Sequence, residues 1–472
     1  MVNPSSLRRL ALPLVLLTIL GASLGVNARL KDRPLLGGDL PDYLMQAWNL
    51  NHHGLLSQDI SQPPRPVLGR EPGYPLLLAA LMRTTALGGF QPSCLTQPGL
   101  CPRAMFRPAL ALGIGMALAA AAALGWAAFR LTGWRGAGVV GFGYVALNGQ
   151  MWSWRHFPQS DYLGLLLACG LAALAAEWVL RQGLPQGRRW AAATGLCLGA
   201  LILVKAAFLW LLPPLLLAWA WMRWRRAVLL PRHAGLVLAL AALPPALWMW
   251  RNGVQTGSFA LTDARSGIAL STREVFDHMG WWDWLCAWVF WTRGFGDDLA
   301  QAVFPAAVWQ PYLLDAAGGY YDVGQNRYPV LVQAAMTARG LPLAAAQAAV
   351  DREMLGAILA HPLGYLASLP ALFWRGIWID EFVLLGLPAL ALLVRRAWRL
   401  GDAAWLLALL PGVFNLVFYP AVSLNIPRYQ ITALPALGLG AAWAAWRLWP
   451  LAEARARAAM ARRRAATPTP AA

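Results

Sequence analysis

The sequence has few charged side chains, and this shortage decides the class of protein. Only 13% of its 472 residues are charged, whereas 58% are hydrophobic. A water-soluble domain carries about 25% charged residues. The mean hydropathy is +0.48. This composition excludes an ordinary globular protein and predicts an all-α polytopic membrane protein.

Lysine is almost absent, since it occurs only at Lys31 and Lys205, so nearly all of the positive charge is arginine. The net charge is +18. Most arginines stand at the ends of apolar runs, where they set topology and contact lipid headgroups, so the basicity does not indicate a nucleic-acid partner. An internal repeat is also missing, which disfavours a transporter built from repeats.

Apolar runs of about 20 residues predict ten membrane-spanning helices. They lie near residues 10–28, 107–129, 136–152, 161–180, 190–204, 206–222, 234–250, 377–394, 403–422 and 430–448. The run at 10–28 is read as an uncleaved first helix, and a small-residue site near Gly25 leaves a cleaved signal peptide as the alternative.

Arginine-rich breaks between the runs predict the cytoplasmic side. With alternating sides, both termini lie inside, and residues 29–106 and 251–376 form large periplasmic loops. We expect one transmembrane domain over residues 1–450 and a basic, disordered cytoplasmic tail over 451–472. The richness in Arg, Ala, Leu and Trp suggests a bacterial protein, and hence the inner (cell) membrane.

Two features modify these helices. Residues 73–89 are apolar, but the run is short and contains Arg83. This pattern predicts a periplasmic juxtamembrane helix that lies in the membrane plane. Pro213-Pro214 and Pro244-Pro245 predict kinks or breaks in their helices.

Cysteine is scarce, with five residues in the chain. Cys94 and Cys101 lie in the polar segment FQPSCLTQPGLCPR on the predicted periplasmic side, where oxidising conditions favour a disulfide. Two unpaired thiols are the alternative. The other cysteines lie in apolar runs and are read as packing residues.

Acidic and basic residues gather on the predicted outer face. The acids are Asp39, Asp42, Asp59, Glu71, Asp161, Asp263 and Asp283, and the cations are Arg70, Lys205, Arg251, Arg265, Arg375 and Arg428. A carboxylate can act as general base toward an acceptor hydroxyl. Arginine or lysine can hold the charge of a departing phosphate. Together they predict transfer of a group from a lipid phosphate.

Several short motifs carry these residues in a fixed order. The first two are GGDLPDYLMQAWNL (residues 37–50) and REPGYPLLLAAL (residues 70–81). The later ones are Ser160-Asp161, Lys205 at a helix break, Arg251-Asn252 and Pro427-Arg428-Tyr429.

In order and spacing this set resembles the GT-C-fold glycosyltransferases, in particular the bacterial relatives of protein O-mannosyltransferases and of lipid A aminoarabinose transferases. The resemblance implies a GT-C-like fold that moves a sugar from a polyprenyl-phosphate carrier to a hydroxyl, with inversion. The acceptor would be a glycan, a lipid or a protein, and no cofactor beyond the lipid-linked donor is implied.

The resemblance also implies roles for individual residues. Asp39 would be the general base, and Asp161 the second catalytic acid. Substrate and phosphate contacts would come from Tyr43, Arg70, Tyr74, Lys205, Arg251 and Arg428. The sequence departs from the family at Leu40, where a Glu usually follows the first Asp, and at Asp161, where the later acid is usually Glu.

Simpler interpretations of the same residues stay open. Asp39 and Asp161 could cap helices, and Arg251 or Arg428 could anchor headgroups. Adjacent side chains on a helix point in different directions, so His52-His53 does not predict a metal site. A flippase for a lipid-linked sugar, or a family member that binds without transferring, are the alternative functions.

Overall fold

The computed structural model describes residues 15–23, 25, 38–61, 63–67, 69–97, 100–153, 159–224, 231–262, 265–379 and 382–466. Every regular element in these ranges is a helix, as the sequence predicted. Residues 15–23 and 25 are helical, whereas the ends of the predicted first span and Asp263 lie outside the described residues.

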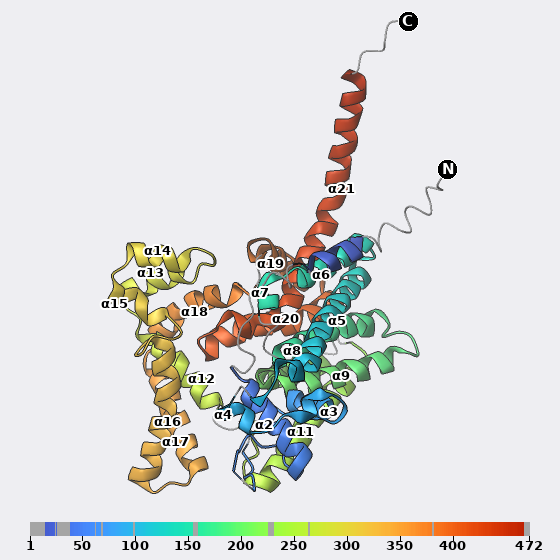
Figure 1. Cartoon of the computed structure of the whole chain (residues 1–472). Coiled ribbons are helices and arrows are strands. Elements are labelled where there is room, and N and C mark those ends of the chain that lie inside the picture. Colours follow the sequence, from blue (N-terminus) through green and yellow to red (C-terminus); the bar gives the residue numbers. More distant parts are fainter. Residues whose placement is uncertain are drawn as a thin grey trace, which may run out of the picture.

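A bundle of apolar helices forms the body of the molecule (Figure 1). Its helices are α5 (Arg107–Thr132), α6 (Arg135–Ala146), α8 (Ser160–Leu180), α9 (Gly187–Val204), α11 (Ala234–Thr256), α19 (Val383–Leu400), α20 (Ala403–Val422) and α21 (Leu434–Ala466). Helix α8 is central, because it packs against α5, α9 and α20. The buried face of α5 is mostly alanine and glycine, which lets neighbouring helices approach closely.

Five helices in the described ranges are long and apolar enough to cross a membrane. They are Arg103–Thr132, Ser160–Leu180, Gly187–Val204, Ala234–Thr256 and Ala403–Val422. A sixth span would result if the bent pair Leu343–Ala360 and Pro362–Ile377 crossed as one. The chain is therefore a helical protein of membrane type, and five of the predicted spans recur as single helices.

The predicted span at 136–152 is wrong as one helix, because the chain divides there into α6 and α7 (Gly149–Ser153). Asn148 explains the break. Its side-chain oxygen accepts a hydrogen bond from the backbone N–H of Met151, and its amide donates to the carbonyl of Ile379. Asparagine thus begins a new helix rather than continuing the old one.

Other predicted spans also start differently. Residues 206–222 begin as the 3-10 helix η4 (Ala206–Leu211), and α10 (Leu212–Trp224) starts where Pro213 and Pro214 need no N–H donor. Helix α19 begins at Val383 and carries three arginines near its end. The run at 430–448 is divided between η7 (Pro427–Ala433) and α21.

Prolines do not break α11, which runs through Pro244 and Pro245 without interruption. The predicted disorder of residues 451–472 is corrected in part, because α21 continues as helix to Ala466. The Ala- and Arg-rich sequence after Pro450 favours helix, and the next proline is Pro468.

The described residues from Gly38 to Phe106 form short helices at one end of the bundle, opposite to the end where α21 leaves it (Figure 1). These are α2 (Leu40–His53), α3 (Gly73–Thr84), η1 (Ala86–Gly89), α4 (Ser93–Thr96) and η3 (Arg103–Phe106). Helix α3 covers most of the predicted juxtamembrane stretch. With 12 residues it is about 18 Å long, too short to cross the hydrocarbon core.

The predicted large loop at 251–376 is helical and projects from the side of the bundle (Figure 1). It contains α12 (Arg265–Glu274), η5 (Val275–His278), α13 (Trp281–Phe290), α14 (Gly296–Val303), α15 (Ala306–Trp309), η6 (Gln310–Tyr312), α16 (Tyr320–Arg339), α17 (Leu343–Ala360) and α18 (Pro362–Ile377). Helices α12, α16 and α17 pack on one another, and α18 packs on α20 and so joins this region to the bundle.

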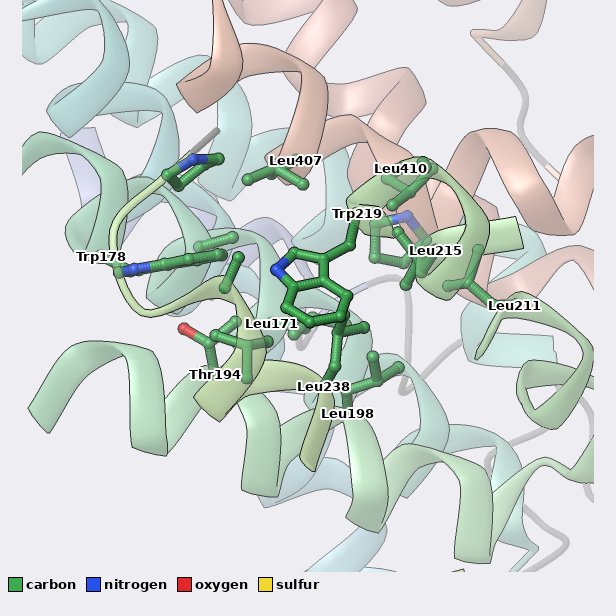
Figure 2. A pocket seen from close by; sticks show the side chains of 16 residues that line it. Leu171, Trp178, Thr194, Leu198, Leu211, Leu215, Trp219, Leu238, Leu407 and Leu410 are labelled. Atoms are coloured by element: carbon green, nitrogen blue, oxygen red, sulfur yellow. The ribbon is translucent and has the colours of Figure 1, made fainter. Parts of the chain in front are cut away.

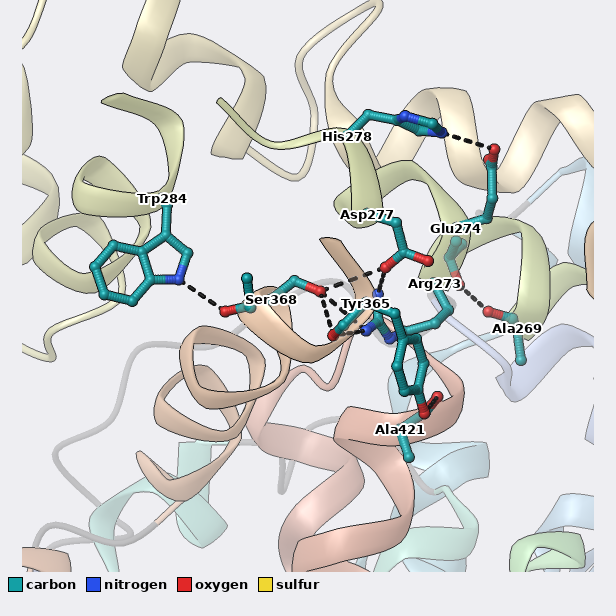
Figure 3. Close-up of polar contacts among 11 residues, drawn as sticks. Ala269, Arg273, Glu274, Asp277, His278, Trp284, Tyr365, Ser368 and Ala421 are labelled. Atoms are coloured by element: carbon teal, nitrogen blue, oxygen red, sulfur yellow. Dashed lines mark hydrogen bonds and ion pairs between the residues drawn. The ribbon is translucent and has the colours of Figure 1, made fainter. Parts of the chain in front are cut away.

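A buried polar cluster joins α12 and η5 to α18 (Figure 3). Arg273 is fully buried and ion-paired with Asp277. Its guanidinium also donates to the carbonyl of Tyr365 at 2.8 Å and to the hydroxyl of Ser368 at 2.9 Å. The Tyr365 hydroxyl in turn donates to the carbonyl of Ala421 in α20. These bonds fix α18 between the outer helices and the bundle.

Candidate active site

Asp39 stands at the start of α2, where the chain turns sharply. Gly38 has a positive φ of 58°, and a Cβ there would lie 2.7 Å from Nε2 of Gln159, so only glycine fits. This contact brings the start of α2 against the start of α8. Asp39 occupies the N-cap position of α2 but makes no side-chain cap bond. Its carboxylate is directed to arginines instead.

Arg70 links the first two sequence motifs. Its Nη2 lies 2.5 Å from Oδ1 of Asp39 and 2.7 Å from Oδ2 of Asp42. The side chain is largely buried, with 11% exposure. The neighbouring carboxylate, Glu71, accepts a hydrogen bond from the N–H of Ala206.

The Glu71 contact explains how the Arg70 turn meets the break after α9. Helix α9 ends at Val204, and Lys205 has an extended conformation. Gly73 packs on this end so closely that a Cβ would lie 2.6 Å from the Val204 side chain and 2.9 Å from the carbonyl of Leu203. The glycine therefore permits the contact that brings Arg70 and Lys205 to the same end of the bundle.

Arg428 bridges the two aspartates that the sequence analysis assigned to catalysis. Its Nη2 lies 2.5 Å from Oδ2 of Asp39, and its Nε lies 2.9 Å from Oδ2 of Asp161. Asp161 is buried, and its other oxygen accepts from Nζ of Lys205 at 2.7 Å. Asp161 lies in the first turn of α8, after the N-cap Gln159, so it does not cap the helix.

The result is an alternating chain of charges, which we call the ion-pair network. Its members are Asp39, Asp42, Arg70, Asp161, Lys205 and Arg428. They come from the start of α2, the loop before α3, the start of α8, the end of α9 and η7. Three cations face three carboxylates, so the network is close to neutral.

Two tyrosines line the same place. The Tyr43 hydroxyl lies 3.0 Å from Oγ of Ser160, and the Arg70 guanidinium lies 5.7 Å from the Tyr43 ring centroid. Tyr74 packs edge-on against Tyr43, with ring centroids 5.3 Å apart. Burial raises the pKa of Tyr43 well above its usual value, so this hydroxyl stays neutral.

The charges set the protonation state of Asp39. Burial alone would raise the pKa of this carboxyl, but the guanidiniums of Arg428 and Arg70 outweigh burial and lower it below its usual value. Asp39 is therefore ionised at neutral pH. The same pairs raise the pKa of Arg70 and Arg428 against the opposing effect of burial.

Arg251 takes no part in the network in the described residues. It lies near the end of α11, where its Nη1 donates to Oδ1 of Asn252 at 3.0 Å. Its guanidinium stacks 4.6 Å from the Trp248 ring centroid. Cys94 and Cys101 lie outside the network as well. They are joined by a disulfide, with Cα atoms 5.5 Å apart.

No group of three or more His, Cys, Asp or Glu side chains that could hold a metal ion occurs in the described ranges. The ring of His52 stacks on Trp48, with centroids 4.3 Å apart, and its Nδ1 lies 2.9 Å from the Trp48 carbonyl.

An apolar cavity of about 100 Å³ lies between α8, α9, α10, α11 and α20 (Figure 2). Leu171, Trp178, Leu198, Trp219 and Leu238 are among its lining residues. Helix α8 connects it to the network, because Leu171 follows Asp161 by ten residues, or about 15 Å along the helix.

The motif analysis did not single out Ser160, Tyr321 or Arg375 for individual roles. Ser160 contacts Tyr43, Tyr321 interacts with charges of the network, and Arg375 interacts with Tyr321. A charged residue near the end of a predicted span was the only signal for Arg375. Nothing in the local sequence marks Tyr321, because its place depends on how α16 folds back.

No model of a known protein family matches this chain, and no curated protein matches it.

Proposed function

We propose that this protein is an integral membrane glycosyltransferase of GT-C type. It moves a sugar from a polyprenyl-phosphate carrier to a hydroxyl acceptor at the periplasmic face of the bacterial inner membrane. The single observation that supports this best is the bridge that Arg428 makes between Asp39 and Asp161. It joins residues from three separate motifs of the resemblance.

The network offers both halves of the chemistry. The carboxylate of Asp39 takes the proton of the acceptor hydroxyl, and the acceptor oxygen forms a bond to the anomeric carbon. The bond from that carbon to the phosphate oxygen breaks, and its electron pair leaves with the polyprenyl phosphate. Attack from the face opposite the phosphate inverts the anomeric centre. Arg70, Lys205 and Arg428 stabilise the charge on the departing phosphate.

Substrate binding and basicity are coupled in this arrangement. Both oxygens of Asp39 are held by arginines, so the carboxylate is a weak base in the free protein. A bound phosphate competes for Arg70 and Arg428 and thereby releases Asp39 to accept a proton. Asp161 keeps Lys205 and Arg428 in place and so acts as a positioning residue.

Two other parts of the fold could hold the prenyl chain of the donor and the acceptor. A prenyl chain held by its phosphate at the network can run along α8 toward the apolar cavity of Figure 2. Tyr321 of α16 is close enough to interact with Asp39, and the outer helices from α12 to α18 would cover the acceptor.

A non-catalytic binder of a lipid-linked sugar is the second candidate. The firm pairing of Asp39 favours it, because a carboxylate held by two arginines serves binding as well as catalysis.

The test is transfer of label from a panel of radiolabelled polyprenyl-phosphate sugars by the purified protein, with native membranes as acceptor source. We expect label in a new product with the wild type and none with Asp39→Asn. The matched control is Asp42→Asn. The Asp42 carboxylate also pairs with Arg70, but among the described contacts it reaches neither Arg428 nor Asp161. Binding of donor without transfer by the wild type would establish the binder. Movement of the lipid across the bilayer without a product would indicate a flippase.

A further inference from the structure

Arg375 is a buried cation near the end of α18. Its side chain is inside the fold, since the residue is only 7% exposed. One guanidinium nitrogen donates to the carbonyl of Leu424 at 3.3 Å, and the group lies 4.8 Å from the ring centroid of Trp291. No carboxylate in the described part of the chain forms an ion pair with it.

Tyrosines connect Arg375 to the ion-pair network. Tyr312, Tyr321 and Tyr429 all lie close enough to Arg375 to interact with its charge. The hydroxyl of Tyr321 also interacts with Asp39, Arg428 and Arg70. Tyr321 is therefore close to charges of the network and to Arg375, which indicates that both belong to one polar region.

The ion-pair network and the surroundings of Arg375 differ in their balance of charge. The three cations of the network face three carboxylates, whereas the partners of Arg375 among the described residues are a carbonyl and aromatic rings. Burying an arginine without a counter-ion costs several kcal/mol. Charged groups in such unfavourable surroundings cluster at functional sites, where an anionic ligand can supply the missing counter-ion.

The position of Arg375 is fixed by its own helix. Seven residues earlier, Ser368 is bonded to Arg273, and Tyr365 ties the helix to both Arg273 and Ala421 (Figure 3). Because α18 is held on two sides, the backbone that carries Arg375 has a fixed position, and the guanidinium itself is held by the Leu424 carbonyl and the Trp291 ring. It is pre-organised for a ligand that comes to it.

We propose that Arg375, with Tyr321 and Tyr429, forms an anion subsite that binds the phosphate group of a phosphate ester together with Arg70, Lys205 and Arg428 of the network. The subsite stands on its own geometry; only the naming of polyprenyl phosphate as its ligand rests on the proposed function. Arginine suits this task, because its planar fork pairs with two phosphate oxygens. The tyrosine hydroxyls supply neutral donors beside it.

The experiment measures binding of polyprenyl phosphate to the full-length protein in phosphatidylcholine nanodiscs by calorimetry. We expect Arg375→Gln to weaken binding by about 10- to 100-fold, since a charge-assisted hydrogen bond to an anion is lost. Arg375→Lys should keep part of the affinity. The matched control is Arg447→Gln, because Arg447 also stacks on a tryptophan, at 4.7 Å from the Trp446 ring, but is exposed. Equal affinity in Arg375→Gln and wild type would overturn the proposal.

Stability in the absence of ligand separates the subsite from a purely structural arginine. Because no carboxylate of the described residues pairs with Arg375, we expect Arg375→Gln to have an unfolding temperature equal to or above that of the wild type. A structural arginine would instead lower the temperature and leave affinity unchanged. Asp380→Asn and Glu381→Gln test the two acids that follow in the sequence, and we expect them to leave binding intact. If Asp380→Asn or Glu381→Gln destabilised the protein as much as Arg375→Gln does, that acid would be the counter-ion of Arg375. This result would overturn the proposal.

Competition identifies the source of the phosphate. Displacement by phosphatidylglycerol as readily as by polyprenyl phosphate assigns the subsite to a membrane headgroup, and displacement by inorganic phosphate alone assigns it to a free anion. If Arg375→Gln does not fold, thermal unfolding of the wild type decides. Polyprenyl phosphate must then stabilise it more than polyprenol does, and equal effects would overturn the proposal. Because these readouts need no turnover, failed sugar transfer does not affect them.

Discussion

Arg428 and Asp39 are separated by 389 positions in the chain, yet their side chains form an ion pair with a nitrogen–oxygen distance of 2.5 Å. This ion pair joins the first motif of the chain to the last one. The same guanidinium reaches Asp161, so one side chain orients two carboxylates.

Replacing Asp39 by Asn tests the general base. We expect sugar transfer to fall by about 10²- to 10⁴-fold, because the amide cannot accept the proton of the acceptor. Donor binding should persist. Label transfer and donor binding are measured on the same preparation, with Asp42→Asn within about tenfold of wild type as the control. A variant that transfers at the wild-type rate would exclude Asp39 as base.

Arg428→Gln tests the bridge. The variant leaves Asp39 and the buried Asp161 without their shared partner, so we expect a loss of about 3 kcal/mol in the free energy of unfolding as well as loss of transfer. Arg428→Lys should recover part of the stability but little activity, because an ammonium lacks the planar fork that reaches two carboxylates. Denaturant unfolding in detergent measures the first effect. If Arg428→Lys were as active as wild type, the bridge would have no role in transfer.

A double-mutant cycle on Lys205 and Asp161 measures their coupling. The pair is largely buried, with 16% and 4% side-chain exposure and a distance of 2.7 Å. We expect Lys205→Met and Asp161→Asn to be less damaging together than the sum of the two single effects, with a coupling energy of about 1–3 kcal/mol. Additive effects would mean that the two side chains do not interact in solution.

The pairing of Asp39 makes stability depend on acid. Its folded-state pKa is lower than its ordinary value of 3.8. The ionised form therefore contributes stability above about pH 4, and this contribution is lost as pH falls through the folded-state pKa. We expect thermal unfolding of wild type and Asp39→Asn to differ by a constant amount from pH 7 to pH 5 and to converge below pH 4. Convergence already near pH 6 would contradict the lowered pKa.

Because Cys94 and Cys101 form a disulfide, we expect the stability of the protein to depend on whether this bond is oxidised or reduced. It closes a loop with a sequence separation of 7, which corresponds to a loss of about 2 kcal/mol in stability when Cys94→Ser removes it. Cys94 and Cys101 should resist alkylation until the protein is reduced. Labelling of the reduced protein after denaturation in detergent serves as the control for reagent access. Equal labelling before and after reduction would show two free thiols.

The sequence by itself determined the helical class of the chain and the positions of five long apolar helices. Long runs of apolar residues can satisfy their backbone only as helices, so α5, α8, α9, α11 and α20 were predictable from hydropathy alone. The motifs also placed Asp39, Arg70, Asp161, Lys205 and Arg428 as candidates, because charge beside apolar runs is costly and seldom accidental.

Only the tertiary structure decided which of these residues meet. Arg251 has the same kind of sequence signal as Arg428, yet one stacks on Trp248 and the other bridges two aspartates. Local hydropathy does not encode such partners, since they come from opposite ends of the chain. Packing also placed Arg375 beside Tyr321 and let Asn148 divide a run that looked continuous. Side-chain hydrogen bonds and close helix contacts decide these outcomes, and neither leaves a periodic pattern in the sequence.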